Sequence, residues 1–204
     1  MKQRLIRWAL IGTLAAMASA CAPLMVGGMV GGAMVASDRR TSGIQLEDEN
    51  IELKANGRIR EMMGSRAHLN ITSYNRQVLI TGEVPNAQDR EYVQRLVSEV
   101  ENVRQVVNET VIGPNSTLTE RSTDALITAK VKGQMVDSKD IFANAYKIVT
   151  ERGVVYLMGR VTQREADRAT EVARQVSGVK KVVRIFEVLT EAELNSLLPA
   201  PPKN

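Results

Sequence analysis

The sequence predicts an α+β protein made of two tandem copies of a small α-β-β-α-β unit, packed on each other after a flexible N-terminal tether. The duplication is indicated by two apolar segments. Residues 78–84, Val-Leu-Ile-Thr-Gly-Glu-Val, match residues 155–161, Val-Tyr-Leu-Met-Gly-Arg-Val, at an offset of 77 residues. The tether is indicated by residues 1–20, which have the charge and hydropathy pattern of an export signal and end just before a cysteine.

The other elements of each copy follow from hydrophobic periodicity. After each strand the sequence becomes helical, over 89–101 and 165–177, and then enters a short Val-rich strand. The Val-rich strands are related by an offset of 76, so we expect a one-residue difference within the helix. Stripes at i, i+4 and i+8 predict an earlier helix in each copy, made by Ala55, Ile59 and Met63 in the first and Ile127, Val131 and Met135 in the second.

These patterns divide the chain into segments. We expect one domain over residues 47–113 and a second over 123–190, joined by a polar Gly-Pro linker at 114–122 and followed by a tail at 191–204. Domains of this size bury limited apolar area by themselves, which is the reason to expect that they pack on each other.

The N-terminus has the features of a lipoprotein signal. Three basic residues precede the apolar segment 8–17, and the small residues Ala18-Ser19-Ala20 stand before Cys21. This resembles a lipobox, although Ala18 replaces the usual Leu, and Ala-x-Ala also suits the ordinary signal peptidase. Cys21 is the only cysteine, and an unmodified lone thiol is a liability in an oxidising compartment. We therefore expect a signal peptide at 1–20 and a lipidated, flexible tether at 21–46.

A retained membrane span is the alternative for this region, because residues 8–37 carry no charge. Pro23 and the Gly-rich run at 27–32 interrupt the apolar stretch and favour a tether instead. Ala22, and not Asp, follows the cysteine. By the sorting rule of enteric lipoproteins, which this position resembles, the expected location is the outer membrane, with the protein facing the periplasm.

Composition argues against several functions. The formal net charge is +4, but removal of the three basic residues of the signal leaves +1, and acidic and basic residues are interspersed afterwards. That distribution disfavours nucleic-acid binding. His68 is the only histidine, too few for a typical zinc site or a nucleophile with a positioned base. We assign no catalytic residue, metal ligand or cofactor.

The pattern resembles the BON-domain proteins of bacterial envelopes. The resemblance rests on the apolar strand ending in Gly, the amphipathic helix, and the Gly-Val-x-x-Val run at 178–182. The second copy also has Gly153 ahead of its strand, where the first copy departs with Gln77. With Cys21 and the segment Asp38-Arg39-Arg40-Thr41-Ser42-Gly43, the chain is similar to division- and stress-associated outer-membrane lipoproteins that bind anionic phospholipid.

The first helix of the second copy carries the candidate lipid site. Beside the core stripe, the same periodicity places Leu126, Lys130 and Gly133 on a neighbouring stripe, with Lys132 close by. An apolar residue beside lysines is expected of a helix that enters a headgroup layer, whereas the first copy offers Lys54 and Arg58 at the matching positions. A contact between the two domains explains Leu126 equally well. The family resemblance implies that this helix binds phospholipid.

The expected function is therefore non-enzymatic binding of anionic phospholipid in support of envelope integrity. The alternative is a protein-binding scaffold that docks on outer-membrane assembly, division or peptidoglycan-remodelling proteins. Gly82 and Gly159, at the ends of the two matching strands, are expected to serve the fold, because a missing Cβ permits a tight backbone approach.

Overall fold

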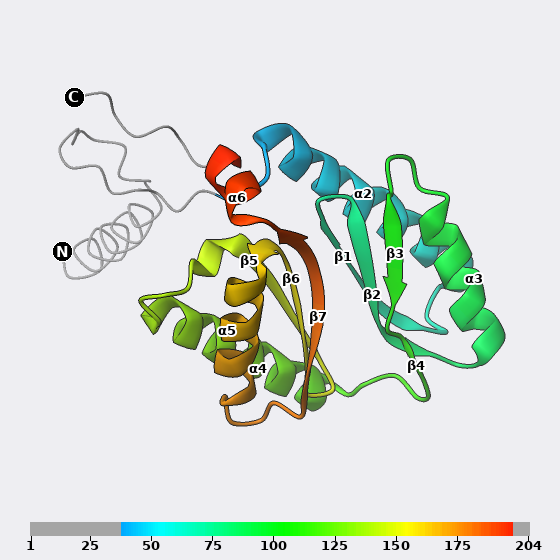
Figure 1. The fold of residues 1–204 in the computed structure, drawn as a ribbon. Helices are drawn as coiled ribbons and strands as arrows, with labels where there is room; N and C mark the ends of the chain where they lie inside the picture. Colours follow the sequence, from blue (N-terminus) through cyan, green and yellow to red (C-terminus); the bar gives the residue numbers. More distant parts are fainter. Residues whose placement is uncertain (1–37, 198–204) are drawn as a thin grey trace, which may run out of the picture. The chain divides into compact units, whose positions relative to one another are not determined.

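The computed structural model describes residues 38–197, so the expected signal, Cys21 and most of the tether lie outside the described residues. The first repeat consists of α2 (Ser42–Met63), β1 (His68–Tyr74), β2 (Gln77–Val84), α3 (Ala87–Ser98), β3 (Gln105–Asn108) and β4 (Val111–Ile112). The second consists of α4 (Leu118–Asp137), the short helix η2 (Ala143–Ala145), β5 (Tyr146–Glu151), β6 (Val154–Thr162), α5 (Gln163–Arg174), β7 (Lys181–Leu189) and α6 (Glu191–Leu197). The expected α-β-β-α-β order is confirmed in both repeats (Figure 1).

Each repeat forms one mixed sheet covered on one side by its helices. The first two strands pair antiparallel, and the third joins the second in parallel, in the orders β1-β2-β3 and β5-β6-β7. The third strand is continuous in the second repeat, where β7 pairs with β6 along its whole length. In the first repeat it is interrupted at Glu109 and Thr110, and β4 resumes the pairing with β2.

The central strands are buried on both faces, which explains their continuous apolar sequences. Along β2, Val78 and Ile80 face the core under α2 and α3, whereas Leu79 faces the other sheet. Along β6, Val155 and Leu157 face the core under α4 and α5, and Tyr156 joins Leu79 between the sheets. The two repeats therefore pack sheet against sheet through a third apolar cluster, and the expected packing of the two domains is seen.

The contact between the sheets has approximate two-fold symmetry. Leu79 and Tyr156 are equivalent residues, 77 positions apart, and each contributes to the shared cluster. At one end of the contact the Tyr74 hydroxyl donates to the Ala145 carbonyl over 3.3 Å. The residues 77 positions away from this pair are Glu151 and His68, and they meet at the opposite end. Such reciprocal use of one surface is the arrangement of an isologous dimer interface.

An aspartate on the first helix of each repeat holds the turn between the first two strands. Asp48 accepts hydrogen bonds from the backbone N–H groups of Asn75 and Arg76, at 2.8 and 2.7 Å. Asp124 accepts them from Arg152 and Gly153, at 2.7 and 2.8 Å. All four turn residues have positive φ, as a tight two-residue hairpin turn requires, and the carboxylates compensate for that conformation.

The structure corrects three details of the expected repeat alignment. Gly153 corresponds to Arg76, with φ of 78° and 62°, and not to Gln77, which is already the first residue of β2. The equivalent strand residues Val84 and Val161 are 77 positions apart, but the helix N-caps Asn86 and Thr162 are 76 apart. The extra residue is therefore in the turn before α3, and not within the helix as expected.

The third correction concerns the first helices. The N-caps Thr41 and Thr117 and the turn-binding aspartates Asp48 and Asp124 are both related by 76 positions. Ile127 therefore corresponds to Ile51 and not to Ala55, one helical turn away from the expected alignment. The expected alignment was wrong because apolar residues at i and i+4 continue along both helices, so that periodicity alone does not fix the register.

Candidate functional site

Helix α4 presents a largely apolar face to solvent. A capping box of Thr117 and Glu120 begins the helix, and one face enters the core through Asp124, Ile127, Val131 and Met135. On the opposite face the side chains of Leu118, Leu126 and Val136 are 79%, 63% and 64% exposed. The exposed small residues Ala129 and Gly133 share this stripe by helical periodicity. Sequence reasoning found Leu126 and Gly133 but missed Leu118 and Val136, which the same periodicity would have included.

Two lysines flank the exposed stripe. Lys130 and Lys132 are both exposed, and the 3.6-residue period places them on its two sides. Neither forms an ion pair or side-chain hydrogen bond within residues 38–197. Nothing lies within 4 Å of a Cβ added at Gly133, so this glycine leaves the middle of the stripe low and open. An apolar line with an unpaired cation on each side suits a surface of acyl chains and anionic headgroups.

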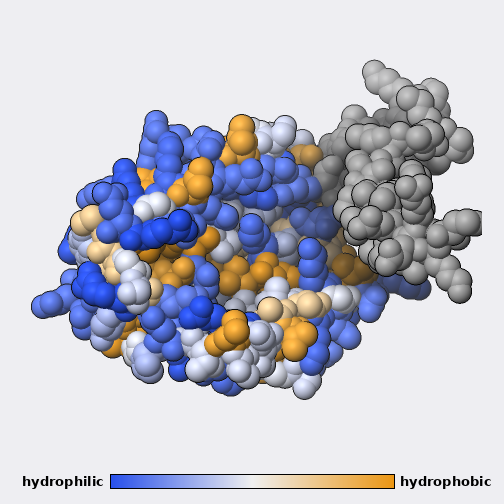
Figure 2. All heavy atoms as spheres, turned by 180° about the vertical axis from the view of Figure 1, so that it is seen from behind, coloured by the Kyte–Doolittle hydropathy of each residue, from blue (hydrophilic) through white to orange (hydrophobic). Residues whose placement is uncertain are grey.

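The exposure of Leu126 separates it from the contact between repeats. That contact is made by the sheets, through Leu79, Tyr156 and their neighbours, whereas the exposed stripe of α4 is on the side of the helix away from the core. Figure 2 shows one face of the molecule, on which hydrophobic side chains emerge among mostly hydrophilic ones. Leu126 is thus available for an external partner.

The matching helix of the first repeat has a different surface. With the corrected register, Asn50 stands at the position of Leu126, Arg60 at that of Val136 and Lys54 at that of Lys130. Lys54 is paired with Glu101 over 3.0 Å, and Arg58, expected at the Lys130 position, instead donates to the carbonyl of Leu96. The helix α2 has two exposed leucines of its own, Leu46 and Leu53, and Leu53 stands at the position of Ala129. The apolar stripe with two unpaired lysines is therefore a property of α4.

The two strand glycines have close backbone neighbours. A Cβ at Gly82 would lie 2.0 Å from the His68 carbonyl oxygen, and φ there is 108°. A Cβ at Gly159 would lie 2.6 Å from the Ala145 carbonyl oxygen. His68 and Ala145 are themselves equivalent in the two repeats, so both glycines let the first strand approach the second at the same point.

The last part of the segment expected to be a flexible tether, 21–46, is instead ordered from residue 38 and binds both repeats. Arg39 donates to both carboxylate oxygens of Glu165, at 2.8 and 2.6 Å, and to the carbonyl of Arg160 at 2.8 Å. Arg40 stacks 4.2 Å above the Tyr74 ring and pairs with Asp48 in the first repeat. The segment thus connects α5 of one repeat to α2 and β1 of the other. The sequence indicates these arginines only as part of a family pattern, because their partners are far away in the sequence.

Two observations bear on attachment and chemistry. Within residues 38–197 no helix is both long and apolar enough to cross a bilayer. Cys21, the expected lipid anchor, lies outside the described residues. The exposed α4 stripe consists of apolar side chains, hydroxyls and the flanking lysines, with the exposed Asp137 beside it at the C-terminal end of the helix.

Comparison with known proteins assigns both repeats to one domain family. The BON domain model matches residues 47–114 and again residues 123–190. The outer membrane lipoprotein DolP of Haemophilus influenzae is 35% identical over 171 residues, which covers 83% of this chain and 89% of that protein. A 21 kDa hemolysin of Actinobacillus pleuropneumoniae is 31% identical and covers 73% of this chain and 78% of its own length.

Among solved structures, one similar chain is CdsD, a structural protein of the type III secretion system of Chlamydia trachomatis. It is 13% identical, with a TM-score of 0.29, and the match covers 75% of this chain and all of the solved chain. The family assignment rests on the two domain matches and on the two relatives above. The chain belongs to the BON-domain family and is a dual BON-domain lipoprotein of the outer membrane.

Proposed function

We propose that the protein is a non-enzymatic membrane-surface protein that binds anionic phospholipid on the periplasmic side of the outer membrane through helix α4. The observation that supports this most directly is the exposed stripe of Leu118, Leu126 and Val136 between the unpaired Lys130 and Lys132. The envelope role follows from the family to which the chain belongs.

The energies favour a weak contact that selects lipid. Burying a Leu-sized side chain in acyl chains contributes about 1.5 to 3 kcal/mol, and each lysine near an anionic surface adds about 1 kcal/mol. Leu118, Leu126 and Val136 are separated by about two to three helical turns, so only part of each becomes buried in a flat surface. A lipid anchor at Cys21 would confine the chain to the membrane, and the high effective concentration would then keep a weak second contact occupied. The helix would select the lipid, and the anchor would supply the attachment.

The test uses phosphatidylglycerol vesicles and the chain from residue 22 onward, which lacks the lipid anchor. Leu126→Glu is expected to weaken vesicle binding at least about tenfold, because tenfold corresponds to 1.4 kcal/mol. The thermal melt should hardly change, since the side chain is exposed. The matched control is Leu53→Glu, because Leu53 is 73% exposed on the corresponding helix of the first repeat. It should retain binding within about twofold.

Two further results decide the headgroup and the alternative. Lys130→Glu should reduce binding to phosphatidylglycerol more than binding to neutral phosphatidylcholine, and added salt should reduce the difference. Equal binding by wild type and a folded Leu126→Glu variant would contradict the lipid site. The exposed stripe would then be assigned to a protein partner, such as a component of outer-membrane assembly or division machinery.

A further inference from the structure

A cluster of one half-buried histidine and two buried glutamates lies where the repeats meet, apart from the α4 stripe. One ligand atom from each of His68, Glu83 and Glu151 can be chosen so that all three lie within 4.8 Å of one another. Glu83 is completely buried and Glu151 is 5% exposed. His68 and Glu83 come from β1 and β2, whereas Glu151 ends β5 of the other repeat. The three side chains therefore meet only when the repeats are packed together.

The two carboxylates are compensated unequally. Glu83 accepts from the guanidinium of Arg152 at 3.1 Å and from the Ser116 backbone N–H at 3.0 Å, and His68 Nδ1 lies 3.4 Å from it. Glu151 accepts only from the side-chain amide of Asn70, at 2.9 Å, and has no ion-pair partner within residues 38–197. The other oxygen of Glu151 has no donor among the described residues, and Glu151 borders a cavity, where a water molecule or a cation can contact it.

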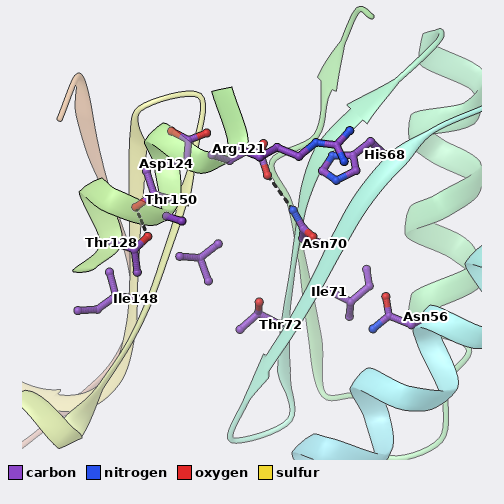
Figure 3. A pocket seen from close by; sticks show the side chains of 13 residues that line it. Asn56, His68, Asn70, Ile71, Thr72, Arg121, Asp124, Thr128, Ile148 and Thr150 are labelled. Atoms are coloured by element: carbon purple, nitrogen blue, oxygen red, sulfur yellow. Dashed lines mark hydrogen bonds between the residues drawn. The ribbon is translucent and has the colours of Figure 1, made fainter. Parts of the chain in front are cut away.

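The opposite end of the contact between the two sheets contains cationic groups that have no counterpart beside Glu151. There the residues equivalent to Glu151 and His68 are Tyr74 and Ala145, which bond directly to each other. The position equivalent to Glu83 is occupied by Arg160, whose carbonyl accepts from the inserted Arg39. Cationic groups therefore fill one end. At the other end a cavity of about 450 Å³ borders His68, Glu151 and Asn70, and the dashed line from Asn70 in Figure 3 marks its hydrogen bond to Glu151.

We propose that His68, Glu83 and Glu151 bind a divalent transition-metal ion, of the Zn²⁺ class, that connects the two repeats. One imidazole and two carboxylates form a ligand set that suits zinc, and the cavity leaves room for a water molecule as a further ligand. Ligands at about 2.0 to 2.2 Å from a metal lie closer together than 4.8 Å, so small side-chain rotations are needed. Glu83 keeps one oxygen on Arg152, which orients the other toward His68.

The ligand types predict selectivity among cations. Imidazole is a poor ligand for Mg²⁺ and Ca²⁺, which prefer six or more oxygen ligands. Zn²⁺ should therefore bind, whereas Ca²⁺ and Mg²⁺ should not compete at similar concentration. Because the ligands belong to both repeats, the bound ion should stabilise their packing and raise the unfolding temperature of the chain.

The experiment titrates Zn²⁺ into the full chain purified in detergent without an affinity tag, with a competing chromophoric chelator to report free metal. Glu151→Gln and His68→Gln are the test variants, and each preserves side-chain size. Glu171→Gln is the matched control, because Glu171 is an exposed carboxylate on α5 that belongs to another ion pair. All variants retain Cys21, so any metal binding at that residue is common to the series.

Wild type and Glu171→Gln should bind one Zn²⁺ per chain at the site and show a higher melting temperature with Zn²⁺. Both test variants should weaken this binding at least about tenfold, the loss that even outer-shell changes commonly cause. Glu151→Gln should also melt no lower than wild type without metal, because it removes an uncompensated buried charge, and this shows that the variant is folded. If wild type and Glu151→Gln bind Zn²⁺ equally, or if neither binds, the metal site is refuted.

Discussion

Replacement of Arg39 by Ala is expected to destabilise the packed repeats strongly. The guanidinium makes two charge-assisted hydrogen bonds to Glu165 and one to the Arg160 carbonyl, and the two side chains of the ion pair are only 5% and 4% exposed. Removing one partner of a buried ion pair leaves the other charge without compensation, which costs about 3 to 5 kcal/mol. For a folded part of this size, that corresponds to a fall in melting temperature of roughly 6 to 20 °C.

The pH dependence of the same variant is specific to the ion pair. Burial by itself raises the pKa of Glu165, but the hydrogen bonds from Arg39 and Thr162 outweigh it, so the pKa is lowered overall. A carboxyl whose pKa is lower in the folded state stabilises the fold above its unfolded pKa of about 4.3, and this contribution is lost as pH falls through the lower folded value. The difference between wild type and Arg39→Ala should therefore be largest near neutral pH and decrease below about pH 4.

Urea unfolding followed by circular dichroism at pH 7 and pH 3.5 measures both effects. Arg168→Ala provides the control, because Arg168 forms ion pairs with Asp140 and Glu171 that are exposed to solvent. Exposed pairs of this kind are worth about 0 to 1 kcal/mol. The reasoning would be refuted if Arg39→Ala cost no more than Arg168→Ala at pH 7, or if its cost were the same at both pH values.

Three further predictions concern backbone and anchor. Gly82→Ala should lower the free energy of unfolding by more than about 2 kcal/mol, because φ is 108° and the new Cβ would meet the His68 carbonyl. Gly133→Ala, in open space on α4, should raise the free energy of unfolding by about 0.5 to 1 kcal/mol. Equal urea midpoints for the two variants would contradict this prediction. Asp124→Ala removes two hydrogen bonds to the backbone of the β5–β6 turn and should cost about 3 kcal/mol in the same assay, and a loss below about 1 kcal/mol would show that the turn forms without it. Cys21→Ala should abolish acylation and signal removal, measured by intact mass and membrane fractionation, and wild-type recovery in the outer membrane would disprove the anchor.

The sequence predicts the fold well because each unit is encoded by a short contiguous segment and that segment occurs twice. Each strand, turn and helix is encoded within one copy, and the matching segments at 78–84 and 155–161 identify the copies independently of any single motif. The continuous apolar strands also indicate burial on both faces, which requires the repeats to pack together.

The contacts between repeats could not be predicted from the sequence, because their partners are far apart in the chain. Arg39 and Glu165 are 126 positions apart, and neither stands in a pattern that selects the other. His68 was interpreted as an isolated histidine, because Glu151 reaches it only through the packing of the two sheets. The face of α4 was found in part, since helical periodicity identifies Leu126 but does not say which of two neighbouring stripes is exposed.

The two-fold symmetry of the contact between the sheets has a consequence for assembly. A surface that each repeat presents to the other can equally be presented to a repeat of a second molecule, so the chain is able in principle to exchange domains. What favours pairing within one chain is the short connection from β4 to α4, residues 113–117, which keeps the partner repeat at high local concentration. A connection too short to permit the turn would therefore favour an exchanged dimer with the same contacts, detectable by its mass in solution.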